Sequence, residues 1–266
     1  MRVGKHLLVL NGRVTIGPQF WYVVALVIAV SFATVLVLKH VVSGSIVLTI
    51  FFLVIAKAEL VLVVGTALTE PGIIPPSSGV AAGDKPATSA IINGVTIERK
   101  WCHSCNHHMP PRAKHCGTCH CCIDRHDHHC RFLSNCVGIR NYRSFVLLLV
   151  NSLVYSVFVV VVLLVGGVGG GTGWGLLVVS SACALILGQL VVYHLRLVLK
   201  GSTSYEQFKG FGIEDEEPQI SPFSLGSWQV NLNAFLTSPT EPSRVTVKDI
   251  HVPNEELVSV LGHERA

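Results

Sequence analysis

Four long apolar runs, separated by polar segments, dominate the pattern of hydrophobic and polar positions along the chain. Each is close to or above the roughly 20 residues that an α-helix needs to cross about 30 Å of hydrocarbon. The pattern predicts four transmembrane helices, at residues 20–38, 46–68, 145–165 and 174–193. Buried helices of a soluble core are the alternative, but little polar chain remains to cover four of them. The first run is too long, and too far from any cleavage site, for a removed signal peptide.

The composition supports a membrane protein. Half of the 266 residues are hydrophobic and only 14% are charged, whereas soluble domains contain about 25% charged residues. The same hydrophobicity argues against a disordered chain. The net charge is +4, and it is not gathered into a dense basic stripe. We therefore expect no nucleic-acid partner.

The distribution of Lys and Arg predicts the orientation in the membrane. Three precede the first run, nine lie between the second and third, none lies between the third and fourth, and six follow the fourth. The positive-inside rule then places both termini and residues 70–144 in the cytosol. The cytosol is reducing, so disulfides are improbable there.

The polar segments complete the expected organisation. We expect a cytosolic N-terminus at 1–19, a helix pair at 20–69, a cytosolic linker at 70–100, a cysteine-rich domain at 101–144, a second helix pair at 145–194 and a cytosolic tail at 195–266. Residues 77–94, rich in Ser, Gly and Ala, predict a mobile loop, and the glycine run 166–173 a short turn. The tail is expected to be irregular, with a solvated acidic run at 214–217.

Two charged residues, Lys57 and Glu59, interrupt the second apolar run. Charge inside a membrane is costly and suggests function by default. The two residues are about 200° apart on a helix, so they cannot pair side by side. We favour a role in packing against other helices or a small polar cavity.

Eight of the nine Cys lie in residues 102–136, and eight of the thirteen His in residues 103–129. Cys-x-x-Cys spacing, which lets one tight turn present two thiolates to a tetrahedral ion, occurs three times in this segment. With His115, His129 and Cys136, these knuckles supply eight ligands, enough for two closed structural Zn²⁺ sites: Cys102, Cys105, Cys116, Cys119, Cys122, Cys136, His115 and His129. The spacing does not decide which ligands share an ion.

An iron–sulfur cluster is the rival occupant, but the histidine content favours zinc. A segment with so few apolar side chains has no core of its own, so bound zinc would supply its folding energy. The predicted fold is therefore an all-α integral membrane protein of four helices, with a small cytosolic zinc-bound domain between the second and third.

Three cysteines remain outside this ligand count. Cys183 lies within the fourth run and is expected to be inert, and Cys121 is interpreted as a surplus knuckle thiol. Cys130 differs, because it directly follows Asp127, His128 and His129. His128 could take its proton and Asp127 could orient the imidazole, as a nucleophilic cysteine requires. A ninth metal ligand or an incidental thiol is the alternative.

The motif around Cys130 resembles the cysteine-rich domain of the DHHC protein S-acyltransferases. The resemblance covers about 45 residues: the Cys102 knuckle, Pro111-Arg112, the 115–122 ligands, Asp-His-His-Cys at 127–130, Asn-Cys-Val-Gly at 135–138 and Asn141-x3-Phe145. Glu70-Pro71-Gly72 is similar to the family's Asp-Pro-Gly motif, and residues 203–206 to its Thr-Thr-x-Glu motif. Pro222 to Gly226, followed by Trp228 and by Asn231 or Asn233, resembles its C-terminal motif, which packs near the active site. Arg131-Phe132, Glu70 and Ser204 depart from the usual residues.

The resemblance implies a ligand pairing and a reaction. One zinc would take Cys102, Cys105, His115 and Cys122, and the other Cys116, Cys119, His129 and Cys136. The activity would be palmitoyl transfer from palmitoyl-CoA, through an acyl-enzyme on Cys130, to cysteines of membrane-associated proteins. Cys130 would lie at the membrane boundary, where an acyl-CoA thioester can reach it.

Candidate groups for the acyl donor are less specific. Candidates for the CoA phosphates or for anionic lipid are the basic residues Arg112, Lys114, Arg125, Arg131, Arg140 and Arg143, although surface solvation explains most of them equally well. Tyr155 could close the acyl-chain cavity or only pack. The expected location is the Golgi or ER membrane, from span length and family habit. A non-enzymatic membrane scaffold is the competing function, but it does not need Cys130.

Overall fold

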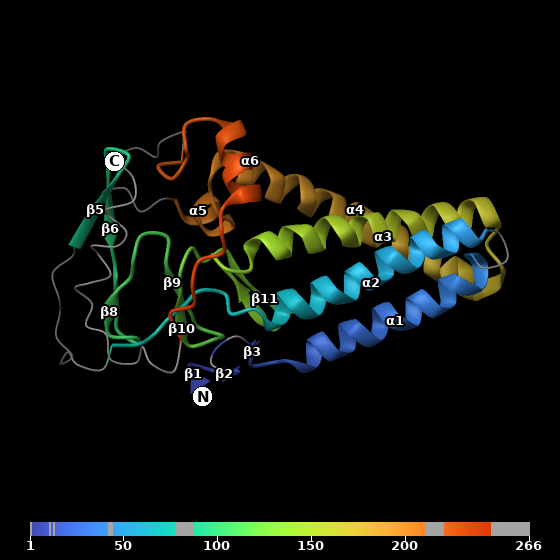
Figure 1. Cartoon of the computed structure of the whole chain (residues 1–266), viewed down its shortest axis with the longest axis horizontal. Helices are drawn as coiled ribbons and strands as arrows, with labels where there is room; N and C mark the ends of the chain where they lie inside the picture. Colours follow the sequence, from blue (N-terminus) through green and yellow to red (C-terminus); the bar gives the residue numbers. More distant parts are fainter. Residues whose placement is uncertain are drawn as a thin grey trace.

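The computed structural model describes residues 2–10, 12, 14–41, 45–77, 88–210 and 221–245. The acidic run at 214–217, interpreted as solvated, lies outside these residues. Within the described residues, a bundle of long helices carries a smaller polar domain at one end (Figure 1).

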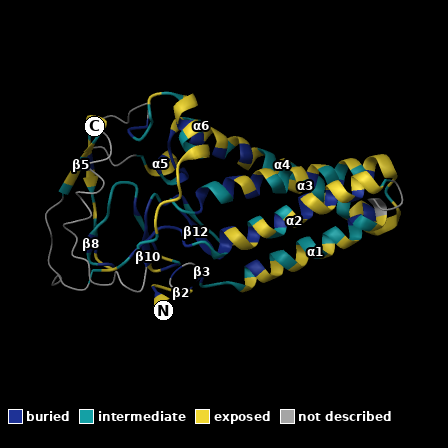
Figure 2. Cartoon of the chain, in the orientation of Figure 1, coloured by how far each residue is buried: buried dark blue, intermediate teal, exposed yellow. Residues whose placement is uncertain are grey.

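Four helices form the bundle: α1 (Trp21–Val41), α2 (Ile46–Leu68), α3 (Tyr142–Gly166) and α4 (Gly170–Lys200). All four are long and apolar enough to cross a membrane, so the prediction of a multi-pass membrane fold is confirmed. α3 packs against both α2 and α4, while α1 packs on α2. Exposed residues cover the outer sides of the helices (Figure 2), as expected of side chains that face lipid.

Several helices are longer than predicted, and α1 ends at Val41 rather than residue 38. α3 begins at Tyr142 rather than residue 145, and α4 runs from Gly170 to Lys200 rather than over 174–193. Much of the expected glycine turn is thus helical, because the backbone hydrogen bonds of a helix do not require side chains. α4 ends at Gly201, whose φ of +66° is the left-handed conformation that closes many helices.

The polar domain is built from short strands, which an all-α description leaves out. In chain order these are β1 (Arg2–Val3), β2 (His6–Val9), β3 (Val14–Ile16), β4 (Ile73–Ile74), β5 (Thr88–Ile92), β6 (Val95–Arg99), β7 (Trp101–Cys102), β8 (His107–His108), β9 (Lys114–Cys116), β10 (Cys121–Ile123), β11 (His128–Cys130) and β12 (Asn135–Val137). They form antiparallel sheets of order β1-β2-β3 and β4-β10-β9, and the hairpins β5-β6, β7-β8 and β11-β12.

The linker is more ordered than predicted. The prediction of a mobile loop at 77–94 is wrong for residues 88–94, because they form most of the β5–β6 hairpin. Residues 78–87 lie outside the described part of the chain. Asn93 and Gly94 turn the hairpin with φ of 48° and 80°. An Asn-Gly pair favours this left-handed turn, so the signal was present in the sequence.

The tail also contains helices where an irregular segment was expected. They are α5 (Ser204–Lys209) and α6 (Trp228–Thr237). α5 begins with a capping box between Thr203 and Glu206, which satisfies free N–H groups of its first turn. α6 packs on α4 beside the polar domain (Figure 1).

The bundle and the polar domain share one apolar core. Val137 from β12 packs there with Tyr142 and Phe145 from the start of α3, Ala67 from the end of α2 and Val198 from α4. Because side chains from both parts are buried together, the position of the polar domain on the bundle is determined by packing.

Glu59 is buried between α2 and α3. Its carboxylate accepts hydrogen bonds from Asn151 Nδ2 at 2.7 Å and Ser152 Oγ at 2.6 Å. Lys57, on the other side of α2, is exposed. The two charges therefore do not pair, and Glu59 joins two helices.

Candidate active site and metal centres

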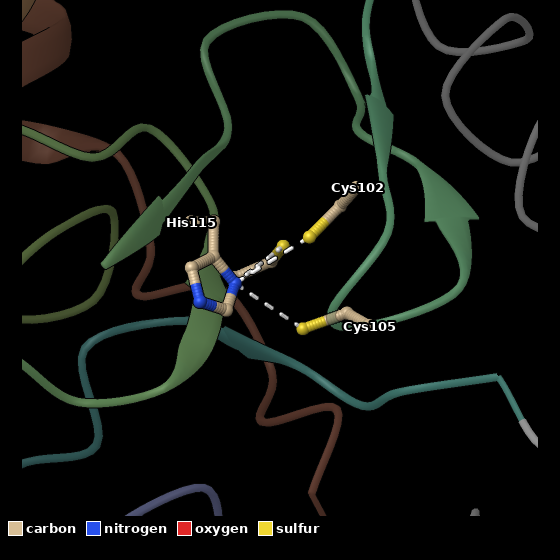
Figure 3. Close-up of side chains that lie close together, drawn as sticks. Cys102, Cys105 and His115 are labelled. Atoms are coloured by element: carbon tan, nitrogen blue, oxygen red, sulfur yellow. Dashed lines mark hydrogen bonds between the residues drawn. The ribbon is translucent and has the colours of Figure 1, made fainter. Parts of the chain in front are cut away.

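The first metal-ligand set consists of Cys102, Cys105, His115 and Cys122. The His115 Nδ1 atom lies 3.4 Å from Cys102 Sγ, 3.5 Å from Cys105 Sγ and 3.8 Å from Cys122 Sγ. Figure 3 shows the thiols of Cys102 and Cys105 directed at the same nitrogen of the His115 ring.

The second set consists of Cys116, Cys119, His129 and Cys136. His129 Nδ1 lies 3.8, 3.2 and 3.6 Å from the Sγ atoms of Cys116, Cys119 and Cys136. The Sγ atoms of Cys119 and Cys136 are 3.5 Å apart. The two groups contain the same residues as the pairing that the family resemblance implies.

Both sets fit a tetrahedral zinc ion. Zn–S bonds of 2.3 Å and Zn–N bonds of 2.0–2.1 Å require ligand atoms about 3.5–3.8 Å apart, and the distances scatter around that range. No disulfide involves any of the nine cysteines, all of which lie within residues 88–210. Each set offers four ligands, which is typical of a closed structural site.

The strand register explains how distant ligands meet. In the antiparallel pair β9–β10, His115 lies opposite Cys122. In the pair β11–β12, His129 lies opposite Cys136. Each hairpin thus brings one histidine and one cysteine together, and the knuckles supply the remaining thiols.

Strand β11 separates the metal ligand from the proposed nucleophile. Alternate residues of a strand point to opposite faces, so His128 and Cys130 share one face and His129 points to the other. Cys130 is partly buried and packs against the apolar core shared with the bundle. The Asp127 carboxylate is fully buried, and its Oδ2 atom lies 2.6 Å from His128 Nδ1.

The ionisation of His128 and Asp127 is coupled. Burial tends to lower the pKa of His128, but its hydrogen bonds to Asp127 and Cys130 outweigh this effect and raise the pKa to about 9. Burial tends to raise the pKa of Asp127, but its contacts with His128 and Ser204 outweigh this effect and lower the pKa. At neutral pH the pair is therefore an imidazolium beside a carboxylate.

Residues 203–206 support this dyad from outside the cysteine-rich segment. The Ser204 backbone N–H donates to Asp127 Oδ1 at 2.7 Å. Arg112 forms two hydrogen bonds with Glu206, at 2.7 and 2.8 Å, and a third with the Gly201 carbonyl oxygen at 3.0 Å. This bidentate pair anchors α5 to the polar domain.

The other predicted donor-site residues are scattered. Arg140 Nη1 donates to Glu70 Oε2 at 2.5 Å, and Arg143 Nη2 to the Ser238 carbonyl oxygen at 2.5 Å. Arg131 lies over the Tyr22 ring. Tyr155 Oη is 3.0 Å from Thr34 Oγ1, inside the bundle between α1 and α3. The structure therefore does not bring Arg112, Arg131, Arg140, Arg143 and Tyr155 into one site.

A different group of cations surrounds a surface pocket. The pocket lies between the end of β6, the segment before β9, and α5. Its lining includes Lys100, Arg112, Lys114, Tyr205, Lys209 and Phe223. Lys114 Nζ lies 4.6 Å from the Tyr205 ring centroid. Sequence reasoning missed Lys100 and Lys209, because they come from segments far apart along the chain.

Several buried polar residues that sequence reasoning did not assign hold the domain to the bundle. Asn135 Nδ2 donates to the carbonyl oxygens of Ala67 and Thr69 at the end of α2. Asn141 accepts from the Gly138 N–H and donates to the Cys136 carbonyl oxygen. Glu70 accepts from the backbone of Gly72 and Ile73. The family-like motifs that contain them were the available signal.

The structure also places Cys121 and the two candidate asparagines of the C-terminal motif. Cys121 is fully buried, with its Sγ 3.7 Å from His6 Nδ1 in the N-terminal sheet. Asn231 is buried and binds the Leu225 N–H and the Leu199 carbonyl oxygen, whereas Asn233 is exposed. Asn231 is therefore the residue through which the C-terminal motif contacts α4.

Fold and site together define a class: a four-helix membrane protein whose cysteine-rich domain combines two metal-ligand sets with a thiol, an imidazole and a carboxylate. Residues 95–169 match the family model described as DHHC palmitoyltransferase. This segment of the chain therefore resembles the DHHC palmitoyltransferase family.

Named relatives are similar to part of this chain. Palmitoyltransferase ZDHHC8 of Drosophila melanogaster is 33% identical over 173 residues, covering 60% of this chain and 18% of the relative. Palmitoyltransferase ZDHHC14 of Danio rerio is 26% identical over 232 residues, covering 67% of this chain and 45% of the relative. Probable protein S-acyltransferase 5 of Arabidopsis thaliana is 29% identical over 184 residues, covering 57% of this chain and 39% of the relative. The matches span less than half the length of these relatives.

Proposed function

We propose that the chain is a protein S-acyltransferase, a palmitoyltransferase that moves a long-chain acyl group from acyl-CoA to cysteines of other proteins. One observation carries the proposal: Cys130 belongs to neither metal-ligand set and shares a strand face with His128, which Asp127 holds at 2.6 Å. A scaffold would not require this arrangement. The names of the relatives support the same activity.

The chemistry follows from the three side chains. His128, as the imidazolium, already holds the proton of Cys130, and the Cys130 thiolate attacks the thioester carbonyl of acyl-CoA. The bond from the carbonyl carbon to the CoA sulfur breaks, and His128 returns the proton to the departing CoA thiolate. Asp127 keeps the imidazole oriented and stabilises its charged form. A cysteine of a second protein then takes the acyl group from Cys130.

Zinc bound to the two ligand sets would have a structural role. Cys102, Cys105, His115 and Cys122 would hold one ion, and Cys116, Cys119, His129 and Cys136 the other. With four protein ligands each, neither ion would have an open position for substrate. The ions would instead stabilise the hairpins that carry His128 and Cys130.

The pocket beside α5 supports a site for the CoA phosphates. Lys100 and Lys209 are exposed at its edge, and Lys114 lies against Tyr205. Arg112 has its guanidinium occupied by Glu206, so we assign it the positioning of α5 and assign phosphate contacts to the lysines. The same helix begins at Ser204, which binds Asp127, so the pocket and the dyad share one element.

The acyl chain would extend into the bundle. Cys130 packs against the apolar cluster to which α1, α2, α3 and α4 all contribute residues. Tyr155 is 13 residues beyond the start of α3, about 20 Å along a helix, and its hydroxyl bridges to Thr34. We propose that this pair forms the floor of the chain site.

The topology supports substrates that are held at a membrane. The N-terminal sheet, the cysteine-rich domain and residues 221–245 lie at one end of the bundle (Figure 1). We place this end in the cytosol, with both termini, because Lys and Arg are concentrated there. The substrates would be membrane-associated proteins with cytosolic cysteines, and the location the Golgi or ER membrane.

The decisive experiment is labelling of the purified chain with palmitoyl-CoA. We expect a hydroxylamine-sensitive label that Cys130→Ser abolishes. Cys183→Ser is the matched control, because Cys183 is an exposed thiol on α4, and it should retain the label. A label that persists in Cys130→Ser would refute the assigned nucleophile.

A further inference from the structure

An exposed cation stands directly beside the proposed nucleophile. Arg131 follows Cys130, and its guanidinium carbon lies 5.9 Å from the centroid of the Tyr22 ring. Tyr22 stacks on Trp21 with ring centroids 3.6 Å apart. Trp21 is 61% exposed and Phe132 is 68% exposed. We call Trp21, Tyr22, Arg131 and Phe132 the Arg131 patch.

The loop that carries Arg131 and Phe132 is packed against the start of α1. Leu133 and Ser134, which follow Phe132, are buried. Ser134 Oγ accepts a hydrogen bond from the Gln19 N–H at 2.7 Å, which ties this loop to the start of α1. Gly17 lies so close to the Ser134 carbonyl that a side chain would not fit between them. The exposed side chains therefore project from a packed loop.

The patch and the donor pocket are built from different elements: the patch from the start of α1 and the loop after β11, the pocket largely from the end of β6, β9 and α5. The dyad is held from α5, through Ser204, and the same helix lines the donor pocket with Tyr205, Glu206 and Lys209. α5 and the start of α1 lie on opposite sides of the polar domain (Figure 1). The phosphates of an acyl donor thus have cationic partners on the α5 side, which leaves Arg131 for another anionic group.

We propose that the Arg131 patch docks the acceptor protein and selects target cysteines that have acidic residues beside them. This inference rests on the proposed function. A cysteine that reaches Cys130 from the α1 side must bring its flanking residues next to Arg131. A flanking carboxylate can pair with the guanidinium, and apolar neighbours can cover Trp21 and Phe132.

The reaction at this surface is the second transfer. The acceptor thiol gives its proton to His128, and its sulfur forms a bond to the acyl carbonyl carbon. The bond from that carbon to Cys130 sulfur breaks, and the proton passes from His128 to Cys130. Arg131 takes no part in these bonds and acts on acceptor binding.

The test is single-turnover transfer from isolated acyl-Cys130 enzyme to two lipid-anchored peptides. The peptides differ only in carrying Asp or Lys on both sides of one cysteine, and each rate is divided by that peptide's rate with a free thioester. We expect the unmodified chain to prefer the Asp peptide about two- to five-fold, the effect of an exposed ion pair. Arg131→Gln should remove the preference, and Arg131→Glu should reverse it.

Lys5→Glu is the matched control. Lys5 is an exposed cation in the N-terminal sheet, so this variant makes the same change in net charge away from Cys130. It should keep the preference for the Asp peptide. An unchanged preference in Arg131→Glu, or a loss of preference in Lys5→Glu, would overturn the docking assignment.

The remaining outcomes separate this inference from its foundations. A chain that forms no acyl-Cys130 refutes the proposed function itself, before any peptide is added. If Arg131 affects both peptides equally, and only in vesicles that contain anionic lipid, it binds a lipid headgroup and the acceptor proposal is wrong.

Discussion

Three consecutive side chains at 128–130 have different environments although they are neighbours in sequence. His129 joins a set of three thiols, while His128 pairs with Asp127 and lies near Cys130. The alternation of a strand produces this separation. A helix at the same place would spread the three side chains around its axis and lose the common face of His128 and Cys130.

Asp127→Asn tests the role of the dyad. Asn keeps the size of the side chain but removes the charge that raises the pKa of His128, so His128 becomes a weaker base at Cys130. We expect acyl-enzyme formation to slow by about 10²-fold or more, with the zinc content unchanged. Asp124→Asn is the control, because Asp124 pairs with Arg244 instead. Equal rates in the two variants would contradict a catalytic role for Asp127.

At the scale of elements, polar contacts inside the bundle join specific helix pairs. Glu59 connects α2 to α3 through Asn151 and Ser152, and Thr34 connects α1 to α3 through Tyr155. Glu59 and Tyr155 are thus paired inside the bundle, where an unpaired polar group would be costly. Because these contacts join α3 to both α1 and α2, α3 is the central helix of the bundle.

Tyr155→Ala should change the acyl-chain preference. Loss of the ring removes the proposed floor between α1 and α3, so acyl-CoA chains longer than palmitoyl should compete better for Cys130. Competition labelling with donors of several chain lengths measures the shift. Tyr155→Phe keeps the ring and loses only the hydrogen bond to Thr34, so a smaller shift is expected. No shift in Tyr155→Ala would place the floor elsewhere.

At the scale of the whole molecule, both ends of the described chain pack on the cysteine-rich domain. Val3 and Leu8 from the N-terminal sheet and Val245 from the tail are buried against the second metal-ligand set. The Lys5 N–H donates to the Cys119 carbonyl oxygen at 2.8 Å. The zinc-ligand hairpins thus serve as a platform for segments more than 200 residues apart along the chain.

Loss of metal should therefore affect more than the cysteine-rich domain. We expect about two Zn²⁺ per chain, retained in Cys130→Ser and reduced in Cys102→Ala and Cys136→Ala. Limited proteolysis after chelation should cleave within 101–144 and also release the N-terminal sheet, because its packing partner unfolds. A stoichiometry near one would refute the paired sites. An unchanged cleavage pattern after chelation would refute the structural role.

The sequence by itself determined the four membrane helices, the ligand types and the candidate nucleophile, because these depend on run length and local spacing. The glycine-rich start of α4 and the linker hairpin escaped prediction, since composition there suggested loops while backbone hydrogen bonds and an Asn-Gly turn favoured structure. Only the tertiary structure could bring Ser204 to Asp127 and Glu206 to Arg112, assign Arg112 to α5, and place Arg131 on the α1 side. These contacts join segments that are far apart along the chain, so no local pattern in the sequence could indicate them.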